Sequence, residues 1–457
     1  MNTRVLRTEV RRSIAPWATL AILVVAFGFL YSFSGPWTKA PLAWDEHWTH
    51  AAEWSRFLLV FLWPIAIGAG VIQGMRDSRS GTVELMTTMP RPGWQRAAKL
   101  AGALGGLLVL GYLLIFAVGA VQAAFNGGFF TVSWLPIVVV GVLAMLAGAW
   151  IGLGIGRLLP HPLTAPAVAV AAFVAVLLFQ FAGTEGSALA GFVPFRVSLL
   201  SPAMDVVRDP FSTTASRMDL GQGVWLAGLA ATGFLLLAGR SKRAKGLAVV
   251  PALVAVVIAL PVLPGTTAEA EVVDPNATEM VCDGPVCAPR MLESELARLA
   301  GPGREALRLL GTLPDAPVKV AVQDRRLGYD EVPSRAADTV HVDLVDWSVR
   351  SRTNPEDVTR ALVAGSGTPI CYSLRGVGGS YLDEIAARSI TASWFLGEWK
   401  MSEGSWLSDD KKNEIVGKWE TFHALPPGVQ RERIIAQRQA GLTCQGNQLD
   451  ILLGGAR

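Results

Sequence analysis

The sequence predicts an α-helical multi-pass membrane bundle followed by an α+β soluble domain. Three observations support this fold class. Long apolar segments occur only before Pro264, all four cysteines occur after it, and the charge balance changes there, from 19 Lys and Arg against 10 Asp and Glu to 21 against 27. Only 17% of the 457 residues are charged, against about 25% in ordinary soluble domains. The net charge of +3 is too small to predict nucleic-acid binding.

Seven segments before Pro264 are long and apolar enough to be membrane-spanning helices, which need about 20 such residues. They cover residues 14–33, 57–75, 100–123, 134–156, 165–183, 224–239 and 246–263. We expect the first six to form a domain over residues 1–239, and the seventh to lie in a connector over 240–264. No small-residue cleavage site follows the first segment, so we expect a retained helix rather than a secretory signal. Recurring glycines in these segments predict close helix packing.

The distribution of basic residues predicts the orientation, because cytoplasmic loops carry the excess of Lys and Arg. With seven spans, the N-terminus and alternate loops hold fourteen basic residues: Arg4, Arg7, Arg11, Arg12, Arg76, Arg79, Arg91, Arg96, Lys99, Arg157, Arg240, Lys242, Arg243 and Lys245. The other loops hold five: Lys39, Arg56, Arg196, Arg208 and Arg217. The sequence therefore predicts a multi-pass plasma-membrane protein with a cytoplasmic N-terminus and an extracytoplasmic C-terminal domain. Residues 3–13 have the pattern of an amphipathic helix lying on membrane lipid, or of a plain basic flank.

The loop between the second and third segments has the most specific pattern of the membrane part. Ser80 or Thr82 can cap a short helix whose apolar side includes Leu85. Pro90 and Pro92 end that helix. We expect a docking element for another subunit on the cytoplasmic face. Its candidate residues are Arg79, Gly81, Thr82, Glu84, Leu85, Pro90, Arg91 and Lys99.

With these residues the chain resembles the ABC-2 family of transporter permeases over residues 1–239. The layout is also similar, with a long loop over residues 184–222 where family members place short re-entrant helices. The resemblance implies a permease subunit, an exporter by expectation, that works as a homodimer or with a related chain. The chain lacks the Gly-x-x-x-x-Gly-Lys-Ser/Thr phosphate loop, so a separate ABC ATPase subunit would bind ATP and no cofactor is expected here. The seventh span and the large C-terminal domain depart from the family pattern.

Charged residues are almost absent from the seven segments, which gives little support to a proton relay or an ion-coupled mechanism.

The C-terminal domain, residues 265–457, contains Cys282, Cys287, Cys371 and Cys444. An even set of cysteines confined to one side of the membrane predicts disulfides in an oxidising compartment. Cys282 can pair with Cys287 and Cys371 with Cys444, but four cysteines allow three pairings and the sequence does not choose between them. A zinc site is the alternative, although the spacing of Cys282 and Cys287 differs from common zinc motifs.

The periodicity of the C-terminal domain predicts helices over residues 291–310, 355–364, 380–399, 411–422 and 428–440, and strands over 318–322 and 339–345. The order strand, helix, later helix with Glu384 resembles gluzincin-type zinc peptidases. Their His-Glu-x-x-His motif is absent, so nothing is predicted to hold zinc. Ser366 lies in Gly-Ser-Gly, which is not the hydrolase Gly-x-Ser-x-Gly elbow. We do not expect an enzyme.

Two functions remain open at the level of sequence. The first is a permease subunit whose outward-facing domain captures, gates or senses a substrate. The second is a membrane-anchored extracytoplasmic sensor, or a catalytically inactive peptidase-like module, without transport.

Overall fold

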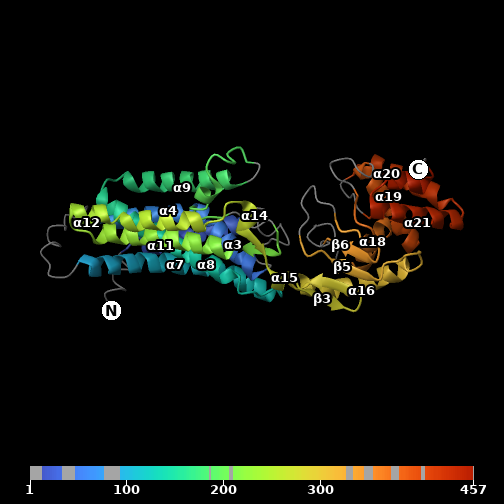
Figure 1. Cartoon of the computed structure of the whole chain (residues 1–457), viewed down its shortest axis with the longest axis horizontal. Helices are drawn as coiled ribbons and strands as arrows, with labels where there is room; N and C mark the ends of the chain where they lie inside the picture. Colours follow the sequence, from blue (N-terminus) through green and yellow to red (C-terminus); the bar gives the residue numbers. More distant parts are fainter. Residues whose placement is uncertain are drawn as a thin grey trace. The chain divides into compact units, whose positions relative to one another are not determined.

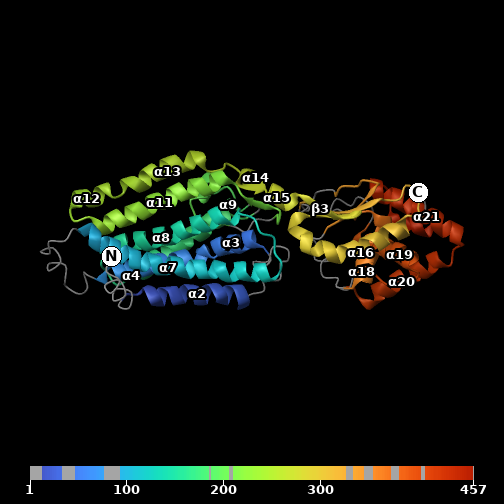
Figure 2. The same cartoon turned by 90° about the horizontal axis from the view of Figure 1, so that it is seen from below.

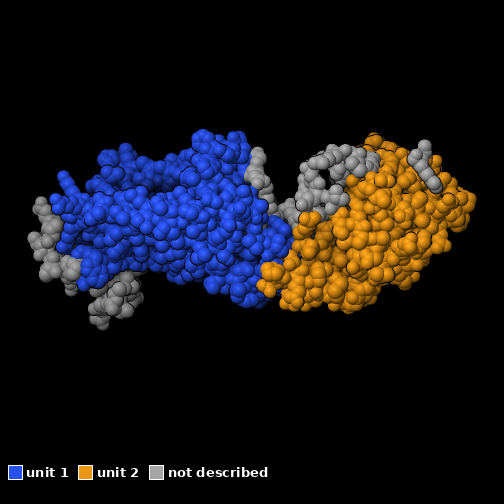
Figure 3. Space-filling model, viewed as in Figure 1, with its two compact units in different colours: residues 1–274 blue, residues 275–457 orange. Residues whose placement is uncertain are grey.

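The computed structural model divides the chain into two compact units, Met1–Asp274 and Pro275–Arg457 (Figure 3). The residues that it describes are 13–32, 47–76, 93–184, 187–204, 209–325, 333–343, 354–371, 380–402 and 407–455. The first unit extends past Pro264 because strand β2, Glu271–Val273, pairs antiparallel with β1, Ser212–Thr214. We call the two units unit 1 and unit 2.

Unit 1 is a helix bundle with six helices long and apolar enough to cross a membrane, or seven if one bent pair counts as a span, among the residues described. The six are α2 Ala15–Ser32, α7 Gly93–Phe125, α8 Trp134–Leu158, α9 Thr164–Gly183, α11 Ser216–Ala238, and α12 Lys242–Leu247 taken together with α13 Val250–Val262. The bent pair is α3 Trp48–Phe57 and α4 Leu59–Gly74, which meet at 52°. Large apolar side chains point outward, such as Val170 on α9 and Val257 on α13, with 61% and 70% exposed. We therefore treat unit 1 as membrane-embedded.

Helix α8 is central to unit 1, where it packs against α3, α4, α7 and α11 (Figures 1 and 2). Glycines make this packing close, as the sequence predicts. A Cβ atom on Gly152 would lie 2.2 Å from the Ile67 carbonyl oxygen of α4. A Cβ atom on Gly233 of α11 would lie 2.3 Å from the Ile151 backbone nitrogen. Small residues let backbones approach where lipid gives no hydrophobic drive for association.

The described charges of unit 1 are distributed unequally between its two ends. One end, which we call the basic end, carries Arg76, Arg96, Lys99, Arg157, Arg240, Lys242, Arg243 and Lys245. The opposite end, which we call the acidic end, carries every Asp and Glu described in unit 1: Glu53, Asp209, Asp219, Glu269, Glu271 and Asp274. It also carries three of the described basic residues, Arg56, Arg196 and Arg217. Figure 2 shows α12 near one end of the bundle and α3 and α14, Thr267–Ala270, towards the other. This sorting is the pattern that the positive-inside rule describes.

The chain leaves unit 1 at a fixed point of the acidic end. The buried Asp274 carboxylate accepts hydrogen bonds from Thr131 Oγ1 at 3.1 Å and from Ser133 Oγ at 3.0 Å. Ser133 directly precedes α8, and the Asp274 backbone N–H donates to the Phe211 carbonyl. The last residue of unit 1 is therefore tied to the central helix of the bundle.

Unit 2 contains a four-stranded sheet with the order β3-β4-β5-β6. The strands are β3 Met280–Asp283, β4 Val286–Pro289, β5 Lys319–Val322 and β6 Thr339–Val342. β3 and β4 are antiparallel, whereas β4, β5 and β6 are parallel. Val286, Val320 and Val340 lie side by side in register and are buried. Helix α16, Glu293–Leu310, packs on this face, where a Cβ on Gly303 would lie 2.7 Å from the Val286 side chain.

The remaining helices of unit 2 are α15 Pro275–Thr278, η1 Arg290–Leu292, α18 Pro355–Val363, η2 Ala364–Gly367, α19 Tyr381–Leu396, α20 Asp409–His423, α21 Pro427–Thr443 and α22 Gln448–Leu453. The five predicted helices and two predicted strands of this domain are present, and their bounds agree within a few residues. The β3–β4 hairpin and α22 were not predicted. Their segments are only four to six residues long, too short for a clear periodicity.

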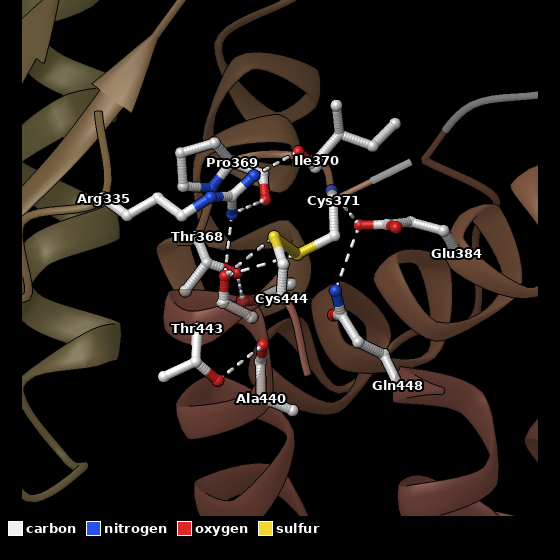
Figure 4. Close-up of a disulfide and its surroundings, with 12 residues drawn as sticks. Arg335, Thr368, Pro369, Ile370, Cys371, Glu384, Ala440, Thr443, Cys444 and Gln448 are labelled. Atoms are coloured by element: carbon white, nitrogen blue, oxygen red, sulfur yellow. Dashed lines mark hydrogen bonds between the residues drawn. A yellow bond between two sulfur atoms is a disulfide. The ribbon is translucent and has the colours of Figure 1, made fainter. Parts of the chain in front are cut away.

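Both disulfides are present, with Cys282 bonded to Cys287 and Cys371 to Cys444. The first joins two directly paired residues of the β3–β4 hairpin. The second joins the segment after η2 to the C-terminal end of α21, where Arg335 donates to the carbonyls of Pro369, Ile370 and Gly441 (Figure 4). The Cys371 backbone N–H donates to the buried Glu384 carboxylate at 2.8 Å. The structure thus selects one of the three possible pairings.

The two disulfides should stabilise the chain unequally. The Cys371–Cys444 bond closes a separation of 73 residues and the Cys282–Cys287 bond one of 5, for which chain entropy gives about 4 and about 2 kcal/mol. Replacing Cys371 and Cys444 together by Ser should lower the midpoint of unfolding of the full-length protein more than replacing Cys282 and Cys287 together. An equal or reversed order would contradict this ranking.

Candidate functional site

The most unusual side chain of unit 1 is Arg56, a guanidinium with 0% exposure inside an apolar bundle. Its Nε and Nη2 atoms each lie 3.1 Å from the Pro202 carbonyl oxygen. Nη2 also donates to Gln222 Oε1 at 2.8 Å, and Nη1 donates to the Ile137 carbonyl at 3.4 Å. Asp219 Oδ1 lies 3.9 Å from Nη1. The guanidinium is thus surrounded by oxygen atoms of three segments: α11, the first turn of α8, and the chain before β1.

Arg56 lies inside the bundle and not in a loop, because the second membrane element begins at α3, earlier in the chain than the sequence predicts. The predicted span started at residue 57, but the bent pair begins with α3 at Trp48. Polar residues recur at every third position of this segment and all are buried: His47, His50, Glu53 and Arg56. Likewise, α11 begins at Ser216 rather than 224 and includes the buried Asp219. The prediction that the spans are almost free of charge is therefore wrong at this end of the bundle.

The segment held by Arg56 is the chain that follows the short helix α10, Phe195–Ser198. Gln222 Nε2 donates to the Leu199 carbonyl at 2.9 Å and to the Ser201 carbonyl at 3.2 Å. Trp225 Nε1 donates to the Leu200 carbonyl at 2.9 Å. Non-helical backbone in a membrane protein is tolerated where the surrounding protein satisfies its polar groups. We call Arg56, Asp219, Gln222 and Trp225 the polar clamp, because three of them bind these carbonyls and Asp219 faces Arg56.

The segment held by the polar clamp forms one wall of a cavity of about 90 Å³ at the acidic end. The cavity lies among α9, α10, β1, α11, α14 and β2. Its lining is Phe179, Gln180, Gly183, Thr184, Phe195, Ser198, Leu199, Ala203, Met204, Thr214, Met218, Thr267, Ala270 and Glu271. Thr214 Oγ1 also donates to Asp219 Oδ2 at 2.9 Å. The cavity wall and the polar clamp are thus joined by direct hydrogen bonds.

Most of the predicted docking residues lie outside the residues that the structure describes: Arg79, Gly81, Thr82, Glu84, Leu85, Pro90 and Arg91. Lys99 is described and is half-buried in the second turn of α7. A Cβ atom on Gly93, the first residue of α7, would lie 3.1 Å from Arg240 Nε. The end of the predicted docking loop therefore lies beside the basic segment that follows α11.

In unit 2, Glu384 and Ser366, the residues considered above for peptidase or hydrolase chemistry, make hydrogen bonds within the core of the domain. Glu384 accepts from the Cys371 backbone and from Gln448 Nε2, and Ser366 donates to Gln437 Oε1 at 2.8 Å (Figure 4 shows the contacts of Glu384). Ser366 is fully buried and has a positive φ of 55°. No cluster of three or more His, Cys, Asp or Glu that could hold a metal ion occurs among the residues described. These side chains organise the core around the second disulfide.

Comparisons with known proteins found no matching family model, no similar curated protein and no similar solved structure.

The polar clamp can be tested by its contribution to stability. Arg56→Ala would leave the buried Asp219 carboxylate without the guanidinium that faces it, and breaking a buried ion pair costs about 3–5 kcal/mol. We expect a marked fall in the melting temperature of the detergent-solubilised protein, followed by tryptophan fluorescence. Arg217→Ala is the matched control, because Arg217 pairs with Glu269 where both are about half exposed and should cost less than about 1 kcal/mol. Equal effects would argue against the clamp.

Stability of unit 2 should depend on pH through His341 of β6. Partial burial lowers the pKa of this imidazole below its usual 6.5, and the nearby Lys319 lowers it further, while Asp338 acts in the opposite direction. The unfolded chain therefore takes up the proton first, so His341 destabilises the fold as pH falls through about 6.5 and below. Comparing unfolding of the wild type and His341→Gln at pH 7.5 and 5.5 should show a smaller pH-dependent loss in the variant. Identical losses would rule out this contribution.

Proposed function

We propose that the chain is the membrane-spanning permease subunit of an ABC transporter, an exporter powered by a separate ATPase. The observation that carries the proposal is the basic end of unit 1. Residues that follow α4, α8 and α11 gather there, together with Arg96 and Lys99 in the first turns of α7, where the permease-like pattern ends. A concentration of Lys and Arg on one end of a membrane bundle is typical of its cytoplasmic face, which is where an ATPase binds and hydrolyses ATP.

Helix α7 supplies a physical connection between that face and the polar clamp. It is one continuous helix of 33 residues, a length of about 50 Å. It begins next to the proposed docking loop and packs against α3, with Phe116 contacting Trp48 at a ring-centroid distance of 6.5 Å. Movement of the docking loop would therefore be transmitted along α7 to the helix that contains Arg56. A second permease subunit, identical or related, would complete the transporter.

In this proposal the acidic end and unit 2 are extracytoplasmic, in the plasma membrane, and the N-terminus is cytoplasmic. Two disulfides in unit 2 support this orientation, because disulfides persist in oxidising compartments. Unit 2 would capture, gate or sense the substrate on that side.

Partner capture tests the proposal directly. Purification of the full-length protein in mild detergent should recover an ABC ATPase, identified by mass spectrometry. The double variant Arg91→Glu/Lys99→Glu should reduce the amount recovered by about tenfold, because reversing charges at a specific interface costs more than 1.4 kcal/mol. The control Lys242→Glu/Lys245→Glu reverses two charges at the same end, outside the loop, and should have a smaller effect.

If no ATPase is recovered with the wild type, the permease proposal is wrong. The membrane-anchored sensor or inactive peptidase-like module would then be the better description. If the control variant loses the ATPase as fully as the loop variant, the docking element is not the loop.

A further inference from the structure

We propose that the Cys282–Cys287 disulfide is a redox-exchange site, which a dithiol of another extracytoplasmic protein reduces to two thiols while unit 2 stays folded. The two disulfides of unit 2 differ in access to their sulfur atoms. Cys282 is exposed and Cys287 is partly buried. In contrast, Cys371 is only 5% exposed and its partner Cys444 is partly buried. Access controls the rate of thiol–disulfide exchange, and exposed disulfides are the labile ones.

The position of Cys282 at the edge of the sheet opens its sulfur atom to attack. Strand β3 stands at the end of the strand order, next to β4, and the disulfide joins directly opposite residues of these two strands. The next residue in that row is Ala321 of β5, on the side of Cys287. A thiolate attacks one sulfur atom of a disulfide, in line with the bond that breaks. It therefore reaches Cys282 from beyond the edge of the sheet, whereas it would have to reach Cys287 over Ala321.

The exchange has two steps, in which electrons and protons balance. One thiolate of the dithiol forms a bond to Cys282 Sγ, the bond to Cys287 Sγ breaks, and Cys287 leaves as a thiolate. The second thiolate of the dithiol then attacks the mixed disulfide and releases Cys282 as a thiolate. Two electrons pass from the dithiol, which becomes a disulfide, to the two cysteines, which take up the two protons that the dithiol has lost. The inference goes beyond the proposed transport function and does not depend on it, since the exchange needs no ATPase.

The β3–β4 hairpin keeps its shape without the disulfide, so the exchange is reversible. Gly284 has a positive φ of 61°, which the two-residue turn between the strands favours. Ion pairs hold both ends of β3, Arg304 to Asp283 at 3.1 Å and Arg290 to Glu279 at 3.0 Å. The disulfide closes a sequence separation of only 5 residues, so its loss returns little chain entropy to the unfolded state. Reduction therefore opens the bond and not the domain, and the two thiols stay opposite each other for reoxidation.

Selective reduction tests the inference on the full-length protein in detergent. The probes are reduced thioredoxin, as the protein dithiol, and dithiothreitol, and the thiols that form are alkylated and identified by mass spectrometry. We expect Cys282 and Cys287 to be alkylated at least tenfold faster than Cys371 and Cys444, with unchanged tryptophan fluorescence. Equal rates, faster loss of the Cys371–Cys444 bond, or reduction only after unfolding would overturn the inference. So would reduction by dithiothreitol without any reduction by thioredoxin.

A matched pair of variants tests which sulfur atom is open to attack. Cys287→Ser leaves Cys282 as a free thiol and Cys282→Ser leaves Cys287, so both variants lack the same bond and share its effect on folding. We expect an impermeant maleimide to label the Cys282 thiol at least tenfold faster than the Cys287 thiol in the folded protein. Equal rates, or faster labelling of Cys287, would overturn the inference that exchange takes place at the edge of the sheet.

Discussion

A charge in the hydrocarbon core of a bilayer has no water to solvate it, and this constraint governs how unit 1 is built. Eight of the eleven described basic residues lie at one end, and all described acidic residues lie at the other together with Arg56, Arg196 and Arg217. Between the ends, α8 packs with α4 and α11 through glycines that bring backbones into contact. Contacts of this kind replace the hydrophobic drive that lipid cannot supply. The arrangement of helices and the sorting of charge thus follow from a single cause.

Arg56 is the basic residue of the acidic end that is fully buried, and its contacts organise the chain around it. Because its guanidinium cannot be left without partners, the Pro202 carbonyl and Gln222 must be held beside it. These contacts hold residues 199–202, and the segment 199–204 forms one wall of the cavity. Arg56 lies near the end of α3, which meets α4 at 52°, and the polar residues His50 and Glu53 of α3 are buried as well. One buried charge is thus linked by hydrogen bonds, directly and through Gln222, to the segment that lines the cavity.

Sequence patterns predicted the long elements well, because seven apolar segments and five periodic helices carry strong local signals. They did not predict α3, whose sequence His-Trp-Thr-His-Ala-Ala-Glu-Trp-Ser-Arg looks like a polar loop unless its partners are known. The three-residue spacing of His47, His50, Glu53 and Arg56 was the available signal. The partners of Arg56 lie 81 to 166 residues away, and local periodicity contains no information about such contacts. The same holds for Glu384, whose role depends on Cys371 and Gln448.

The central claim is that the two ends of unit 1 face opposite sides of the membrane, with the basic end inside the cell. The cysteines are all paired in disulfides, so single cysteines introduced at exposed sites can be labelled selectively. His161→Cys reports on the basic end and Ala190→Cys on the acidic end. In intact cells an impermeant maleimide should label Ala190→Cys, and should label His161→Cys only after the membrane is opened. Labelling of both in intact cells, or of His161→Cys alone, would contradict the account.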